Sequence, residues 1–148
     1  MKPLLPVFAA LLLAQPAFGQ SVIDRDFTIS VPNGQGDPII ESTTLVPLLD
    51  GTCFHWHLRF GKTKGAIEVV ELYSLPSAPK IWGLGENSQT VLSKDRRSAT
   101  TPRSLVPDQG WIGHGWCVTE GDPEGDYSFE IRRGDELLGR FDFELREL

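Results

Sequence analysis

The chain has 148 residues, a net charge of −6 at pH 7 with histidine counted as neutral, and 15 glycines and 11 prolines. This length is enough for one domain with a single core. The acidic balance gives no general attraction for nucleic acid or anionic lipid. No stretch after the N-terminus approaches the apolar length of a membrane-spanning helix. We therefore expect neither a nucleic-acid-binding nor a membrane-spanning protein.

Residues 1–19 have the layout of a secretory signal peptide. Met1-Lys2 gives a positive start, Leu4 to Ala14 is apolar, and Ala17-Phe18-Gly19 is a small-x-small cleavage site. We expect cleavage after Gly19, which leaves a single domain over residues 20–148. The leader removes one lysine and no acidic residue, so the net charge becomes −7. The expected location is periplasmic or secreted.

Short runs of β-branched and aromatic residues between glycines and prolines predict an all-β fold. Pro47 indicates an edge strand or a strand end. Asp50-Gly51 predicts a tight type I′ hairpin, in which both residues have positive φ. The run 66–73 is apolar on both faces, so we expect it in the centre of a sheet. The expected strands are residues 23–31, 39–49, 52–60, 66–73, 111–119, 127–132 and 137–145.

Cys53 and Cys117 predict one disulfide, because an even pair of cysteines in an oxidising compartment is most simply cross-linked. Strand 52–60 alternates, with phenylalanine, tryptophan and leucine on one face. Both cysteines lie on the polar faces of their strands. A bond between neighbouring strands on an outer face is therefore favoured over one through the core.

This bond predicts the register of two strands. If Cys53 lies opposite Cys117 in an antiparallel pair, both faces match, and a slip of one residue would destroy the match. The outer pairs are then His55 with Gly115, His57 with Gly113, and Arg59 with Trp111. The inner pairs are Phe54 with Trp116, Trp56 with His114, and Leu58 with Ile112.

The C-terminal sequence Pro123-Glu124-Gly125-Asp126-Tyr127-Ser128-Phe129-Glu130-Ile131, followed by Gly134, Leu138 and Phe141-Asp142-Phe143, resembles the closing hairpin of bacterial immunoglobulin-like domains. The resemblance implies an immunoglobulin-like antiparallel β-sandwich of about seven strands. Two antibody-type hallmarks are absent. Trp56 follows Cys53 too closely, and Gly115 occupies the place of a corner tyrosine. Because this fold hosts unrelated tasks, the resemblance leaves function open.

Residues 86–107 are polar and predict a long loop. The loop holds the one locally basic segment of the chain, with Lys94, Arg96, Arg97 and Arg103. Together with the outer face that carries Arg59 and Trp111, it is the expected binding surface for an acidic partner. The alternative is a solvated loop that contacts nothing.

His55 and His57 have the i, i+2 spacing of some metal sites, but the sequence identifies no third ligand. We favour an interpretation in which the two rings cover the bare backbone of Gly113 and Gly115. No pattern of a nucleophile with its base is present, so we expect no enzymatic activity and no cofactor.

The sequence thus predicts an exported, non-catalytic binding or scaffolding domain of the bacterial cell envelope, with an envelope protein or glycan as partner. One alternative is a periplasmic metal-binding protein that uses His55 and His57. Another is an inhibitor of a cell-wall-degrading enzyme that acts through the basic segment 93–103. The sequence leaves the oligomeric state open.

Overall fold

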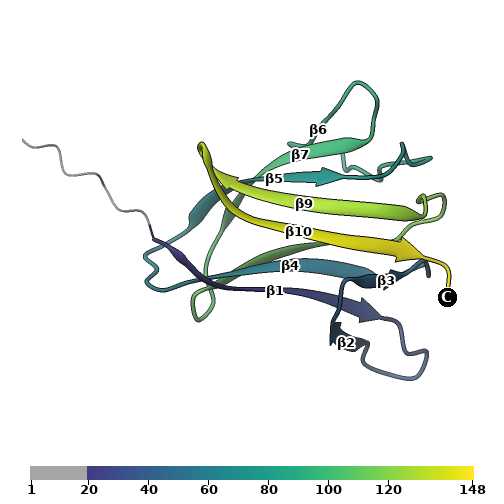
Figure 1. Cartoon of the computed structure of the whole chain (residues 1–148), viewed down its shortest axis with the longest axis horizontal. Coiled ribbons are helices and arrows are strands. Elements are labelled where there is room, and N and C mark those ends of the chain that lie inside the picture. Colours follow the sequence, from purple (N-terminus) through teal and green to yellow (C-terminus); the bar gives the residue numbers. More distant parts are fainter. Residues whose placement is uncertain (1–19) are drawn as a thin grey trace, which may run out of the picture.

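The computed structural model describes residues 20–148, so the expected signal peptide lies outside the described residues. Two β-sheets pack face to face (Figure 1). Within residues 20–148 no helix is long and apolar enough to cross a membrane.

The smaller sheet has four strands in the order β2-β1-β4-β8, and the larger has six in the order β3-β10-β9-β5-β7-β6. All neighbouring strands are antiparallel except β3 and β10. The four-stranded sheet contains β1 (Val22–Val31), β2 (Ile39–Ser42), β4 (Cys53–Phe60) and β8 (Trp111–Cys117). The six-stranded sheet contains β3 (Leu45–Pro47), β5 (Ile67–Ser74), β6 (Val91–Leu92), β7 (Ser98–Leu105), β9 (Gly125–Arg133) and β10 (Glu136–Arg146).

The expected β-sandwich is confirmed, and seven of its strands are long. The other three, β2, β3 and β6, have two to four residues each and lie at sheet edges. Alternation along the long strands places one side chain in two between the sheets. The apolar residues at every second position of the C-terminal hairpin are all buried: Tyr127, Phe129, Ile131, Phe141, Phe143 and Leu145.

The expected strand 39–49 is divided between the two sheets. Its first part forms β2 beside β1, and its second part forms β3 beside β10. Pro47 ends an edge strand, as its missing N–H predicts. The prediction of a hairpin at Asp50-Gly51 is wrong, because β3 and β4 belong to different sheets. Of the two residues, only Gly51 has a positive φ (83°). Thr52 N–H donates to the Leu49 carbonyl, and both features fit a type II turn.

Strand β5 lies inside the six-stranded sheet, as expected, but it is not apolar on both faces. Val70 points outward and is 40 % exposed, whereas Glu71 is completely buried. Because Val70 is apolar, the sequence predicts a second buried face that β5 does not have. The outer face of this sheet is open to solvent, so β5 alternates like any strand of a sheet with one covered face.

The prediction of a long loop over residues 86–107 is also wrong. Strands β6 and β7, with the turn that joins them, occupy residues 91–105, and β7 pairs with β5 along eight residues. Serine and threonine at the outward positions make β7 look like a loop, although Ala99 and Thr101 are buried. Pro102 is tolerated because the short β6 pairs only with Ala99 and Thr100, which leaves that side of Pro102 unpaired.

The predicted disulfide and register are confirmed. Cys53 is bonded to Cys117. Strands β4 and β8 are antiparallel neighbours, and all seven expected pairs occur, from Cys53 with Cys117 to Arg59 with Trp111. The bond lies on the outer face, so it joins two strands of one sheet and not the two sheets.

A tyrosine corner is present at a place where the sequence interpretation did not look for one. The Tyr127 hydroxyl, at the start of β9, donates to the Pro123 carbonyl at 2.6 Å. Burial raises the pKa of Tyr127 well above its ordinary value, so the hydroxyl remains a donor. A tyrosine bonded to the backbone a few residues upstream is a feature of immunoglobulin-type sandwiches.

Candidate functional site

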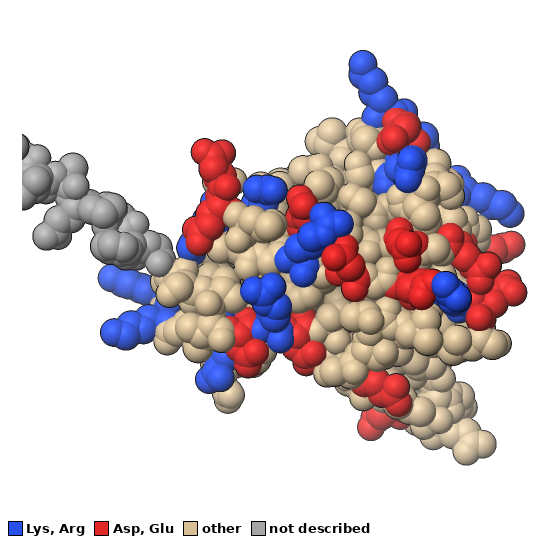
Figure 2. All heavy atoms as spheres, viewed as in Figure 1, with Lys and Arg blue, Asp and Glu red and all other residues tan. Residues whose placement is uncertain are grey.

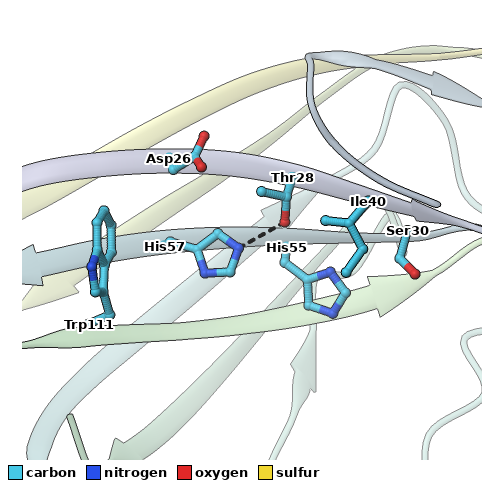
Figure 3. A pocket seen from close by; sticks show the side chains of 7 residues that line it. All are labelled: Asp26, Thr28, Ser30, Ile40, His55, His57 and Trp111. Carbon is cyan, nitrogen blue, oxygen red and sulfur yellow. Dashed lines mark hydrogen bonds between the residues drawn. The ribbon is translucent and has the colours of Figure 1, made fainter. Parts of the chain in front are cut away.

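The outer face of the four-stranded sheet carries a groove of about 440 Å³. We call it the outer-face groove. Side chains from β1, β2, β4 and β8 line it, and Figure 3 shows them in place. The lining residues are Asp26, Thr28, Ser30, Ile40, His55, His57 and Trp111.

The registers of β1, β4 and β8 bring these residues together. Thr28 lies opposite His55 and Asp26 opposite His57. His57 Nε2 is 2.9 Å from the Thr28 hydroxyl oxygen, which fixes the ring toward β1 (Figure 3). The groove therefore has a rigid floor of paired strands, an indole at one end and an isoleucine toward the other.

The two imidazole rings lie over glycines of β8. A Cβ atom on Gly115 would overlap the His55 ring, and one on Gly113 would lie 2.9 Å from His57 Nδ1. The rings are stacked with centroids 6.2 Å apart. The expected role of His55 and His57 as covers of bare glycine backbone therefore matches the geometry, and any larger residue at these glycines would push a ring away.

Burial lowers the pKa of both His55 and His57 below the usual 6.5. For His55 the neighbouring His57 lowers the pKa further, whereas Asp26 partly offsets the effect of burial on His57. Both rings are consequently neutral at pH 7. The groove thus presents uncharged imidazoles beside hydroxyl groups and one carboxylate.

The part of the chain that the structure describes contains no group of three His, Cys, Asp or Glu residues placed to hold a metal ion. Two imidazoles alone do not provide the three protein ligands usual for a zinc site. The geometry therefore gives no support to the metal-binding alternative at His55 and His57.

The expected basic binding surface is divided among three places. Arg59 lies over the Trp111 ring, with Cζ 6.0 Å from the ring centroid, at the end of the sandwich where β4 leads into β5. Lys94, Arg96 and Arg97 are exposed in the turn between β6 and β7, at the opposite end (Figure 1). Figure 2 shows basic side chains projecting there, and acidic and basic groups interspersed over the rest of that face.

Arg103 does not belong to any exposed basic surface, because it points into the sandwich. Its Nη2 atom donates to Glu71 Oε1 at 3.0 Å, and only 16 % of its side chain is exposed. Arg103 therefore lies apart from Lys94, Arg96 and Arg97, with which the sequence grouped it. Its position on the inward phase of β7, two residues after buried Thr101, is the physical reason.

Glu71 is the centre of a buried polar cluster that the sequence interpretation missed. Its Oε2 accepts a hydrogen bond from Trp56 Nε1 at 2.6 Å, and its Oε1 accepts one from Trp116 Nε1 at 2.8 Å as well as that from Arg103. His114 Nδ1 lies 3.7 Å from Oε2. We call these five residues the Glu71 cluster. The two tryptophans come from the four-stranded sheet, so the carboxylate links both layers.

One signal in the sequence points to this cluster. Glu71 has the same phase as Ile67, Val69 and Tyr73 on β5, all of which are buried. An acidic residue on the apolar phase of a central strand needs a partner in the core. Arg103 on the neighbouring strand and the indole N–H groups of two inward tryptophans are such partners.

Comparisons with known proteins agree with the fold. A family model described as PM0630 beta sandwich domain matches residues 25–146. A crystal structure of an immunoglobulin-like protein from Pseudomonas aeruginosa is similar, with a TM-score of 0.60 and 21 % identity, over 86 % of this chain and 97 % of that chain. At this identity the similarity establishes the fold alone.

A second solved structure, the alkylpurine DNA glycosylase AlkC of Pseudomonas fluorescens bound to DNA, matches with a TM-score of 0.34 and 15 % identity. It covers 70 % of this chain and 28 % of that chain. A search of the curated proteins found no match.

Proposed function

The chain belongs to the PM0630 beta sandwich domain family, and from this premise we propose that it is an exported, non-catalytic binding domain of the bacterial cell envelope. Its contact site is the outer-face groove, and its partner is an envelope protein or glycan. The observation that carries the proposal is the groove itself, a concave surface on a rigid sheet with rings at its walls and a few polar groups. Binding sites commonly have this composition.

Two features support binding over catalysis at this groove. The rings of His55 and His57 lie against glycine backbone, and Thr28 already engages the free Nε2 of His57. Both rings are thus held in fixed positions, which suits a preformed binding surface. Trp111 and Ile40, by contrast, offer apolar surface that a partner would cover, and aromatic residues are enriched at such contacts.

Export is supported by the cross-link. Cys53 and Cys117 form a disulfide, which persists in oxidising compartments such as the periplasm. The layout of residues 1–19 is that of a signal peptide. Both features are consistent with a domain that works outside the cytoplasm.

The test is affinity capture from a Gram-negative envelope extract, with residues 20–148 as bait. Wild type is compared with an Ile40→Asp/Trp111→Ala variant of the groove and with Val70→Ala, a control on the outer face of the other sheet. We expect the groove variant to lose about tenfold or more of the captured partner, since apolar anchors in an interface contribute most of its affinity.

Equal capture by the wild type and the groove variant would remove the groove from the proposal. A specific hydrolase or transferase activity of the purified domain, abolished by the same groove variant, would overturn the non-catalytic assignment. Far-ultraviolet circular dichroism of each variant verifies that loss of capture is not loss of fold.

A further inference from the structure

A second pocket, of about 370 Å³, lies at the side of the sandwich between β8, β7 and the segment 83–90. We call it the side pocket. The segment is held in place by the hydroxyl groups of Thr90 and Thr101, whose oxygens are 2.8 Å apart. The lining residues are Gly83, Leu84, Gly85, Ser88, Gln89, Thr90, Thr101, Pro102, Arg103, His114, Gly115 and Trp116.

The ionisable residues of this lining are all of the cationic type. They are Arg103 and His114, both able to carry positive charge, and no carboxylate lines the pocket. The other polar residues are hydroxyl and amide side chains. Glu71 stands behind this wall and is completely buried, so it cannot contact a ligand in the pocket.

Glu71 fixes which atoms of the two cationic residues remain for a ligand. Arg103 donates to the carboxylate through Nη2, and its Nε is buried. His114 turns its buried Nδ1 toward Glu71 Oε2. The nitrogen atoms that remain for a ligand are Arg103 Nη1 and His114 Nε2, because Arg103 Nη2 is bonded to Glu71 and the other two nitrogens, Arg103 Nε and His114 Nδ1, are buried. Arg103 Nη1 is always a hydrogen-bond donor. His114 Nε2 is a donor when it carries a proton.

We propose that the side pocket binds small ligands through a carboxylate group, which accepts hydrogen bonds from Arg103 Nη1 and His114 Nε2. Glu71 is the positioning residue, because it bonds Arg103 and lies 3.7 Å from His114 Nδ1 without touching the ligand. Guanidinium and imidazolium groups match carboxylates in charge and geometry. This site is separate from the outer-face groove, and the proposal does not depend on that groove.

Binding is coupled to proton uptake by His114. The charged and titratable groups that face its ring are Glu71 from β5, Arg103 from β7 and His55 from β4. Burial, followed by Arg103, lowers the pKa of His114 below 6.5, so the ring is neutral at pH 7. A bound carboxylate favours the protonated ring. The affinity for a carboxylate therefore rises as the pH falls below 7.

The test uses the wild-type domain and a matched pair of sugars in ¹H–¹⁵N nuclear magnetic resonance titrations. Glucuronate carries a carboxylate, and glucose is its neutral counterpart. The indole N–H of Trp116, bonded to Glu71 and part of the lining, reports on the pocket. We expect saturable shifts of this signal with glucuronate and none with glucose, and an affinity about fivefold higher at pH 5.5 than at pH 7.5.

N-acetylalanine has the same carboxylate on a peptide unit, and its affinity relative to glucuronate distinguishes a peptide C-terminus from an acidic sugar. His114→Gln is expected to weaken binding about tenfold and to remove its pH dependence, while Arg132→Gln, on an exposed arginine of β9, changes neither. Arg103→Lys is the second variant, because lysine keeps a positive charge beside the Glu71 carboxylate.

Equal shifts with glucose would overturn the proposal in favour of a neutral sugar site. Absence of saturation with both carboxylates would overturn it altogether, as would a pH dependence that persists in folded His114→Gln. The groove variants of the capture experiment lie outside the side pocket, so the failure of one proposal leaves the other intact.

Discussion

The outer-face groove and the Glu71 cluster contain the same kinds of residue on opposite faces of the same strands, with opposite consequences. His55, His57 and Trp111 face outward and present neutral rings to solvent. Trp56, Trp116 and His114 face inward and surround a buried carboxylate. A slip of β8 by one residue against β4 would turn Trp111 inward and His114 and Trp116 outward. The face of the strand on which a residue lies, rather than its type, thus decides whether it forms the surface groove or the buried cluster.

The two regions should also differ in how they respond to substitution. Changes at Glu71 or Trp56 act on folding, since they leave buried groups without partners. Changes in the groove act mainly on binding and on local ring positions.

Glu71→Gln should lower the free energy of unfolding by about 3 kcal/mol or more, because it leaves the largely buried Arg103 without a counter-charge. The measurement is urea unfolding followed by tryptophan fluorescence. Glu68→Gln, three residues earlier on the exposed face of β5, is the matched control and should change stability by less than about 0.5 kcal/mol. Equal effects of the two variants would show that Glu71 is not a joint between the sheets.

Removal of the disulfide in Cys53→Ala/Cys117→Ala should cost about 2–4 kcal/mol. The bond closes a loop with a sequence separation of 64, for which the chain-entropy model gives about 4 kcal/mol as an upper figure. Urea unfolding of oxidised wild type and of the double variant gives the difference. The groove should keep its partner in the folded double variant, because β4 and β8 remain paired along six further positions. Loss of capture at full folding would contradict this.

Gly113→Ala should destabilise the domain more than Gly115→Ala, by about 1–3 kcal/mol. The new Cβ at Gly113 would lie 2.6 Å from the Trp56 carbonyl oxygen, which the strand backbone holds in place. At Gly115 the obstacle is the His55 ring, which can rotate outward. Gly115→Ala should then raise the pKa of His55 toward 6.5, as measured by nuclear magnetic resonance. An unchanged His55 pKa would mean that the ring does not lie on Gly115.

The smallest effect is a pH dependence of stability. The pKa values of His55, His57 and His114 are lowered in the folded chain, so the unfolded chain binds more protons just below pH 6.5. Stability is therefore retained above pH 6.5, falls as the pH drops below it, and levels off below the folded pKa values. Urea midpoints between pH 8 and pH 5 measure the fall. A His55→Gln/His57→Gln variant should show a shallower slope, and a slope as steep as that of wild type would contradict the assignment.

The sequence was sufficient to predict the sandwich and the β4–β8 register for a physical reason. One covalent constraint, Cys53 with Cys117, and two alternating strands leave a single register in which both faces match. The C-terminal hairpin was equally predictable, because its aromatic residues recur at every second position.

The missed features are those in which local sequence and tertiary context disagree. Strand β7 is rich in serine and threonine and contains a proline, so its membership of a sheet depends on β5 beside it. The path of 39–47 from one sheet to the other likewise depends on β10. The burial of Glu71 could not be predicted without knowing that two tryptophans of the facing sheet donate hydrogen bonds to it. For the candidate sites, sequence identified the histidine pair and Trp111 but not the inward direction of Arg103.

The position of the cross-link has a mechanical consequence. The bond ties two strands within one layer, while the described chain starts in one layer with β1 and ends in the other with β10. Tension on the two ends would shear the layers apart without loading the sulfur atoms first. The 64-residue interval would stay closed during extension, so the oxidised chain should reach a length about 220 Å shorter than the reduced one at full stretch. In a domain with this arrangement the two sheets can separate under tension while β4 and β8 stay joined by the disulfide.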